Sequence, residues 1–146
     1  MSTTRRPYFI ISALPADDMA QQDLEVEQVF HLKAEEARDE VEKMKKSLND
    51  NGFDFDWRLG CKETLDKLDA AEHVDGIIFG FGLRGHPAPS ISILFEELIE
   101  KVRYHPKNVK MFFNWSIPSS LDACQRAMKL KADKEKEAAG AAQEVI

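Results

Sequence analysis

Four segments of the chain have the hydrophobic pattern of β-strands. Residues 8–14 and 74–82 are nearly continuous apolar runs, as expected for strands that are covered on both faces. Residues 109–115 form a third apolar run. Residues 53–59 alternate instead, with aromatic residues and leucine on one face and charged residues on the other. One face of an alternating strand lies in water, so we expect this strand at an edge of the sheet.

Each predicted strand is followed by a segment in which apolar residues recur at steps of three and four, the spacing of an amphipathic helix. Asn49–Gly52 is a helix-ending signal, and Pro106 ends a later helix. The last helix begins at Ser119 or Ser120, and few large apolar residues follow Lys131. The expected helices cover residues 25–48, 62–73, 90–105 and 119–131.

This alternation of strands and helices predicts an α/β fold with parallel strands and right-handed crossovers. The spatial order 2-1-3-4 places the two most buried strands in the centre and the alternating strand at an edge. We therefore predict a single three-layer domain over residues 1–130, flavodoxin-like or Rossmann-like, with helices on both faces of the sheet. Residues 131–146 are expected to be a polar tail that frays or is disordered.

Composition narrows the classes of partner. The 146-residue chain has a net charge of −6, and its Lys and Arg residues are scattered, which argues against a nucleic-acid or membrane-surface partner. No apolar run has the length of a membrane span, and the apolar run after Arg6 is too short and too acidic at its end for a signal peptide. Cys61 and Cys124 have no metal-ligand spacing. We expect a cytoplasmic protein with free thiols and no metal.

Gly80–Gly85 (GFGLRG) matches the glycine pattern of dinucleotide-binding folds letter for letter. In those folds the motif links the first strand directly to a helix whose N-terminus binds the pyrophosphate. Here it ends the third strand, His86–Pro89 precede the expected helix, and the next strand ends in Asn114 rather than an acid. We therefore expect no dinucleotide and no other cofactor, and a flavin ranks behind both hypotheses given below.

The residues from Asp75 to Met128 resemble a group of small bacterial and fungal proteins to which no activity is assigned. Those proteins share a GxGxR loop after an apolar strand, an LFExLI helix, and an FN pair before a helix that contains Asp-Ala. The resemblance implies a parallel α/β fold and marks Arg84 and Asn114 as motif positions. This chain departs from the group at Trp115 and Ile117, where small polar residues are expected.

A parallel sheet gathers the loops after its strands at its carboxyl edge, where open α/β sheets bind ligands. Arg84 is the expected anion-binding side chain, and His86 with Asp17 is a candidate acid–base pair. An exposed loop histidine is also commonly just solvated, and asparagine at a strand end is also a turn former. The remaining candidate ligand-binding residues are Gly82, Gly85, Asn114, Ser12 and Ser116.

Two functions follow from these residues. The first is the binding of a small anionic or polar metabolite at the carboxyl edge, with cofactor-independent isomerase, lyase or hydrolase chemistry if the protein is an enzyme. The second is a non-catalytic, homodimeric binding or interaction module in which the glycines are architectural. The edge strand at residues 53–59 and the apolar stripe of the first helix are surfaces that a second copy could use.

Overall fold

The computed structural model describes residues 5–13, 33–59 and 61–144. Four parallel strands form one sheet in the order β2-β1-β3-β4, which confirms the predicted α/β class and strand order. The alternating strand, β2, lies at an edge as expected. The strands are β1 (Tyr8–Ser12), β2 (Asp54–Leu59), β3 (Gly76–Phe79) and β4 (Met111–Phe113).

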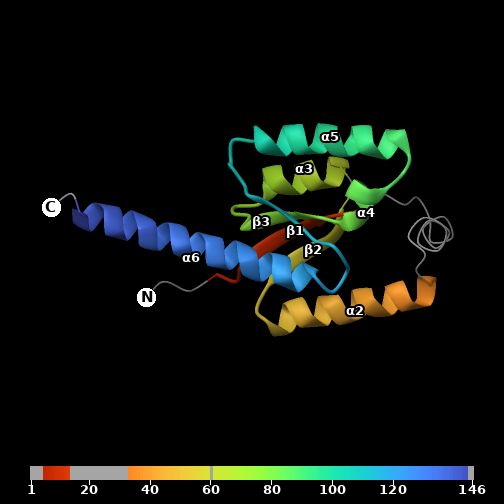
Figure 1. The fold of residues 1–146 in the computed structure, drawn as a ribbon, viewed down its shortest axis with the longest axis horizontal. Helices are drawn as coiled ribbons and strands as arrows, with labels where there is room; N and C mark the ends of the chain where they lie inside the picture. Colours follow the sequence, from red (N-terminus) through yellow and green to blue (C-terminus); the bar gives the residue numbers. More distant parts are fainter. Residues whose placement is uncertain (1–4, 14–32, 60, 145–146) are drawn as a thin grey trace.

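Helices cover both faces of the sheet (Figure 1). Two of them, α2 and α6, lie on one face, and α3 and α5 lie on the other, which gives three layers. The part of the predicted first helix before residue 33 lies outside the described residues. The helices are α2 (Ala34–Asp50), α3 (Cys61–Ala70), α4 (Phe81–Gly85), α5 (Pro89–Arg103) and α6 (Ser120–Glu144).

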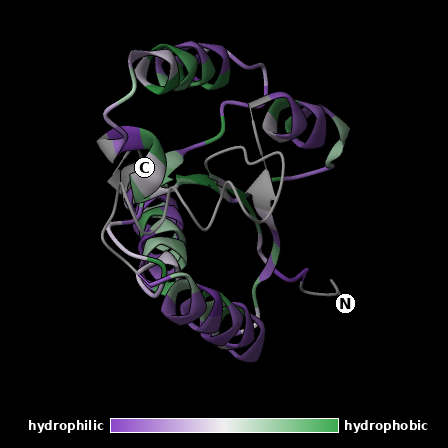
Figure 2. Ribbon diagram, turned by 90° about the vertical axis from the view of Figure 1, so that its right-hand side faces the viewer, coloured by the Kyte–Doolittle hydropathy of each residue, from purple (hydrophilic) through white to green (hydrophobic). Residues whose placement is uncertain are grey.

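The alternation of side chains along the central strands divides the core in two. Phe9 and Ile11 point toward α2 and α6 and pack with Met44, whereas Ile10 and Phe79 pack on the α3 and α5 side. All of these side chains are fully or almost fully buried. Figure 2 shows mostly hydrophobic strands in the centre and helices with mixed faces around them, the arrangement that a sheet covered on both sides requires.

The structure corrects the expected end of the third strand. β3 ends at Phe79, and residues 81–85, predicted as strand end and loop, form the short helix α4. The Gly80 amide donates to the Ser12 carbonyl at 2.8 Å, and a Cβ on Gly80 would lie 3.3 Å from that oxygen. The Leu83 amide then bonds back to the Gly80 carbonyl. This turn places Leu83, 3% exposed, in the core, and burial of Leu83 accounts for the helix.

The last helix continues past the predicted end of the domain. α6 is helical to Glu144, although residues 131–140 are all exposed, and its C-terminal half extends beyond the sheet (Figure 1). Fraying of this segment stays a prediction. In the described part of the chain, none of the helices is long and apolar enough to cross a membrane.

Two weakly acidic groups, the buried Cys124 thiol and the half-buried Tyr8 phenol, are expected to make stability depend on pH in the alkaline range. Burial raises the pKa of the Cys124 thiol to about 12. Burial, the hydrogen bond donated to Asp56 and the charge of that carboxylate raise the pKa of the Tyr8 phenol well above its usual value. In the unfolded chain these groups ionise near pH 8.5 and 10. The folded state therefore keeps protons that the unfolded state loses, and stability falls as pH rises above about 8.5.

The expected result is a lower urea midpoint at pH 11 than at pH 8, measured in the presence of a thiol reductant. The double variant Tyr8→Phe/Cys124→Ala should show a shallower decline, whatever its stability at pH 8. If the urea midpoint falls equally between pH 8 and pH 11 in both proteins, other groups cause the loss of stability at alkaline pH.

Candidate functional site

The predicted site residues that the structure describes all lie at the carboxyl edge of the sheet. Ser12 ends β1, Arg84 and His86 follow β3, and Asn114 and Ser116 follow β4. Asp17 lies outside the described residues, so its pairing with His86 stays a prediction. The structure therefore brings these residues to one edge of the sheet, but their side chains differ from one another in their contacts and exposure.

Asn114 has an internal role. Its side chain is 2% exposed. Its Oδ1 accepts a hydrogen bond from the Phe81 amide at 2.8 Å, and its Nδ2 donates to Ser120 Oγ at 3.1 Å. The first bond satisfies an amide at the start of α4 and the second joins β4 to the start of α6. Asn114 thus joins the end of β4 to the starts of α4 and α6.

The Arg84 side chain is exposed to solvent, and contacts with the end of β4 hold it in place. One Nη donates to the Asn114 carbonyl, and the guanidinium carbon lies 5.5 Å from the centre of the Phe113 ring. A guanidinium carries five N–H donors in a fixed fork. The bond to the Asn114 carbonyl uses one of its nitrogens, so the end of β4 orients the guanidinium, which retains donors for a ligand.

A hollow of about 410 Å³ lies beside Arg84, between α4 and α5. Its apolar wall contains Leu83, Phe95 and Ile99. Phe95 is fixed because its ring stacks on buried Phe79, with 5.4 Å between ring centres. This volume is at the lower end of the range for small-molecule sites. The complete lining is Leu83, Arg84, Ser92, Phe95, Glu96, Ile99 and Glu100.

The sequence reasoning missed the two acidic residues of this hollow. Glu96 and Glu100 occupy successive turns of α5 and are exposed, so each has the pattern of an ordinary solvated helix face. Among the described residues, neither carboxylate forms an ion pair with Arg84. The one available signal was the LFExLI stretch, because Glu96 is the glutamate of that motif. The hollow therefore presents a cation and two anions that do not neutralise one another.

The other predicted residues do not line this hollow. His86 is half-buried, and its Nδ1 accepts a hydrogen bond from the Ala88 amide at 3.0 Å. Gly82 and Gly85 flank Leu83 and Arg84 within α4. The architectural role of these two glycines stays a prediction.

The two serines take part in local hydrogen bonding. Ser12 is fully buried, and its Oγ accepts a bond from Thr64 at 3.0 Å, which joins β1 to α3. Ser116 Oγ accepts a bond from the Ser119 amide, and Ser119 Oγ binds back to the Ser116 amide and carbonyl. These bonds form the turn that leads into α6.

No group of three His, Cys, Asp or Glu side chains among the described residues could hold a metal ion. Cys124 lies fully buried in α6. Comparison with protein-family models and with curated proteins gave no match. The geometry of the carboxyl edge is thus the basis for any functional assignment.

Proposed function

We propose that this is a cytosolic protein that binds a small polar metabolite in the hollow between α4 and α5. The observation that supports this is the presence of Arg84, Glu96 and Glu100 around one hollow with an apolar wall. Two carboxylates beside one guanidinium disfavour a ligand that is only anionic, because like charges repel. The hollow is best matched by a molecule with an anionic group for Arg84, a cationic or donor group for the glutamates, and an apolar part.

If the protein turns its ligand over, His86 is the candidate proton carrier, because a histidine can accept and donate protons near neutral pH. His86 follows Arg84 at the same edge of the sheet but does not line the hollow, so this role requires a ligand that extends beyond it. Cofactor-independent isomerase, lyase or hydrolase chemistry is then the class to test. A non-catalytic binding module is the alternative.

Amino acids with apolar side chains are suitable probes, because they carry both charges and an apolar body. Leucine can be compared with 4-methylpentanoate, which lacks the ammonium group, and with 3-methylbutylamine, which lacks the carboxylate. We expect leucine to raise the melting temperature more than either compound at equal concentration, since a ligand that binds only the folded state stabilises it.

Arg84→Ala should raise the Kd for leucine at least tenfold, because a hydrogen bond to a charged group contributes about 1.5–3 kcal/mol. Isothermal titration measures this change, and Arg103→Ala is a matched control on the exposed end of α5. The proposal is wrong if Arg84→Ala and Arg103→Ala bind leucine equally, or if leucine binds no better than its two analogues.

A further inference from the structure

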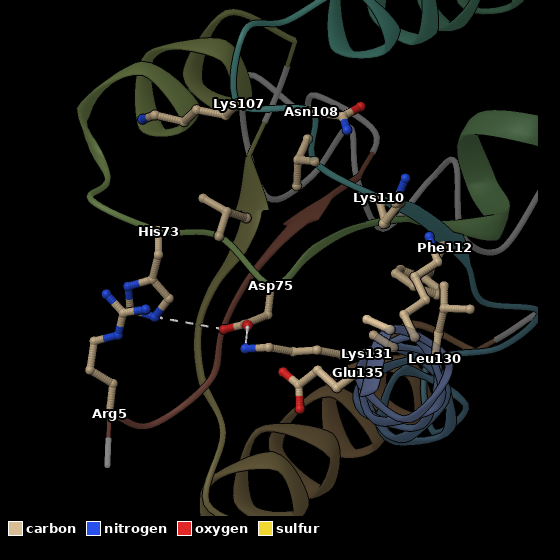
Figure 3. Close-up of a pocket in the computed structure, with 15 residues that line it drawn as sticks. Arg5, His73, Asp75, Lys107, Asn108, Lys110, Phe112, Leu130, Lys131 and Glu135 are labelled. Atoms are coloured by element: carbon tan, nitrogen blue, oxygen red, sulfur yellow. Dashed lines mark hydrogen bonds and ion pairs between the residues drawn. The ribbon is translucent and has the colours of Figure 1, made fainter. Parts of the chain in front are cut away.

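A larger hollow, of about 480 Å³, lies at the opposite edge of the sheet (Figure 3). It is bounded by the chain before β1, the loop that precedes β3, the loop that precedes β4, and α6 where this helix extends beyond the sheet. Its volume is within the range of small-molecule sites. None of the residues considered for the carboxyl edge contributes to it.

The charge of this hollow is opposite to that of the protein. Five Lys and Arg side chains and two carboxylates line it, whereas the whole chain carries a net charge of −6. Lys107 has a structural role, because its Nζ donates to three carbonyls at the end of α3. The side chains of Arg5, Lys110 and Lys134 form no hydrogen bond or ion pair with any described residue. Three cations therefore remain uncompensated around one cavity.

The floor of the hollow is polar and already has one anion. The Asp75 side chain is 10% exposed, accepts a hydrogen bond from the Tyr8 amide at 2.9 Å and lies 3.4 Å from Lys131 Nζ. His73 Nε2 lies 3.6 Å from Asp75, too far for a hydrogen bond, and it has no hydrogen-bond partner among the described residues. In Figure 3 Arg5 and His73 lie on the same side of the hollow. Asp75 is thus already contacted by Lys131 and by the Tyr8 amide.

The rest of the wall is apolar and partly exposed to solvent. Phe112 and Leu130 lie on the side opposite Arg5 and His73 in Figure 3, and Leu130 is 38% exposed. The other apolar lining residues are Val74, Val109, Ala127 and Ala138. The hollow thus combines several cations with an apolar wall, and it matches a molecule that has both an anionic group and an apolar part.

We propose that this amino-edge hollow is a second binding site, for an organic anion with an apolar body. The cations that line the hollow, Lys110 and Lys134 among them, attract the carboxylate or phosphate of the ligand, and its apolar part lies against Phe112 and Leu130. The cations line one cavity of about 480 Å³, a volume that matches a small molecule rather than a nucleic acid.

The aromatic sulfonate 1-anilinonaphthalene-8-sulfonate (ANS) has these two parts and reports binding by its fluorescence. We expect saturable binding to the folded full-length protein at low salt. Lys110→Glu/Lys134→Glu should raise the Kd at least tenfold, since each change replaces attraction by repulsion. The control is Lys129→Glu/Lys136→Glu, which makes the same change in net charge at exposed positions of α6 outside the hollow and should stay within twofold of the wild type.

Displacement of the dye tests the ligand class. Decanoate and decyl phosphate should both compete, and the stronger competitor identifies the head group; decanol and inorganic phosphate should not compete. Equal displacement by decanol, displacement by inorganic phosphate alone, or equal loss in both charge-reversal variants would overturn the proposal. Arg84→Ala should leave ANS binding unchanged. Loss of ANS binding in that variant would place the dye at the α4–α5 hollow and would also contradict a second site.

Discussion

Replacing Phe79 by alanine is expected to lower the free energy of unfolding by about 4 kcal/mol. Phe79 is fully buried in the central strand β3, and its ring centre lies 5.4 Å from that of Phe95 and 5.6 Å from that of Phe113. Truncation removes the transfer free energy of the ring, leaves a cavity and breaks both aromatic contacts. Urea unfolding followed by circular dichroism measures the loss.

Two further variants show whether burial causes this effect. Phe79→Leu keeps most of the volume and should cost about 1 to 2 kcal/mol. Tyr104→Ala removes an aromatic ring that is 69% exposed and should change stability by less than about 0.5 kcal/mol. Similar losses for Phe79→Ala and Tyr104→Ala would contradict the position of Phe79 in the core. Because Phe95 lines the α4–α5 hollow, Phe79→Ala should also weaken ligand binding there.

Asn114→Ala is expected to lower the free energy of unfolding by about 3 kcal/mol. The change removes the hydrogen bond that the Phe81 amide donates at 2.8 Å and the one that Ser120 Oγ accepts at 3.1 Å. Each buried group that loses its hydrogen bond costs about 1–3 kcal/mol. Asn114 is therefore expected to stabilise the starts of α4 and α6. Urea unfolding followed by circular dichroism tests this.

A double-mutant cycle separates the two bonds of Asn114. Ser120→Ala removes one partner, so Asn114→Ala and Ser120→Ala together should cost less than the sum of the single changes. Gln125→Ala removes an exposed amide from α6 and should be nearly neutral. If Asn114→Ala is as harmless as Gln125→Ala but weakens ligand binding, Asn114 is a ligand-binding residue as the sequence predicts, and its internal bonds contribute little.

The candidate site was only partly predictable. Arg84 could be placed at the carboxyl edge because it follows an apolar strand, and the ends of parallel strands lie together. Glu96 and Glu100 could not be assigned, because exposed glutamates on a helix are the usual composition of a solvated face. Asn114 was predicted at the right edge, but its side-chain partners come from two other elements. Its role depends on contacts that the local sequence does not contain.

The hydrophobic periods of this chain, taken alone, determine its four strands, the helices after them and the edge position of β2. These features depend on which residues avoid water, a property that each segment carries locally. Tertiary structure decided the rest. The turn of α4 forms because Leu83 reaches the core, and the amino-edge hollow unites Arg5, Asp75, Lys110 and Lys134 from four separate segments. Proximity between distant segments arises only when the sheet and its helices pack together.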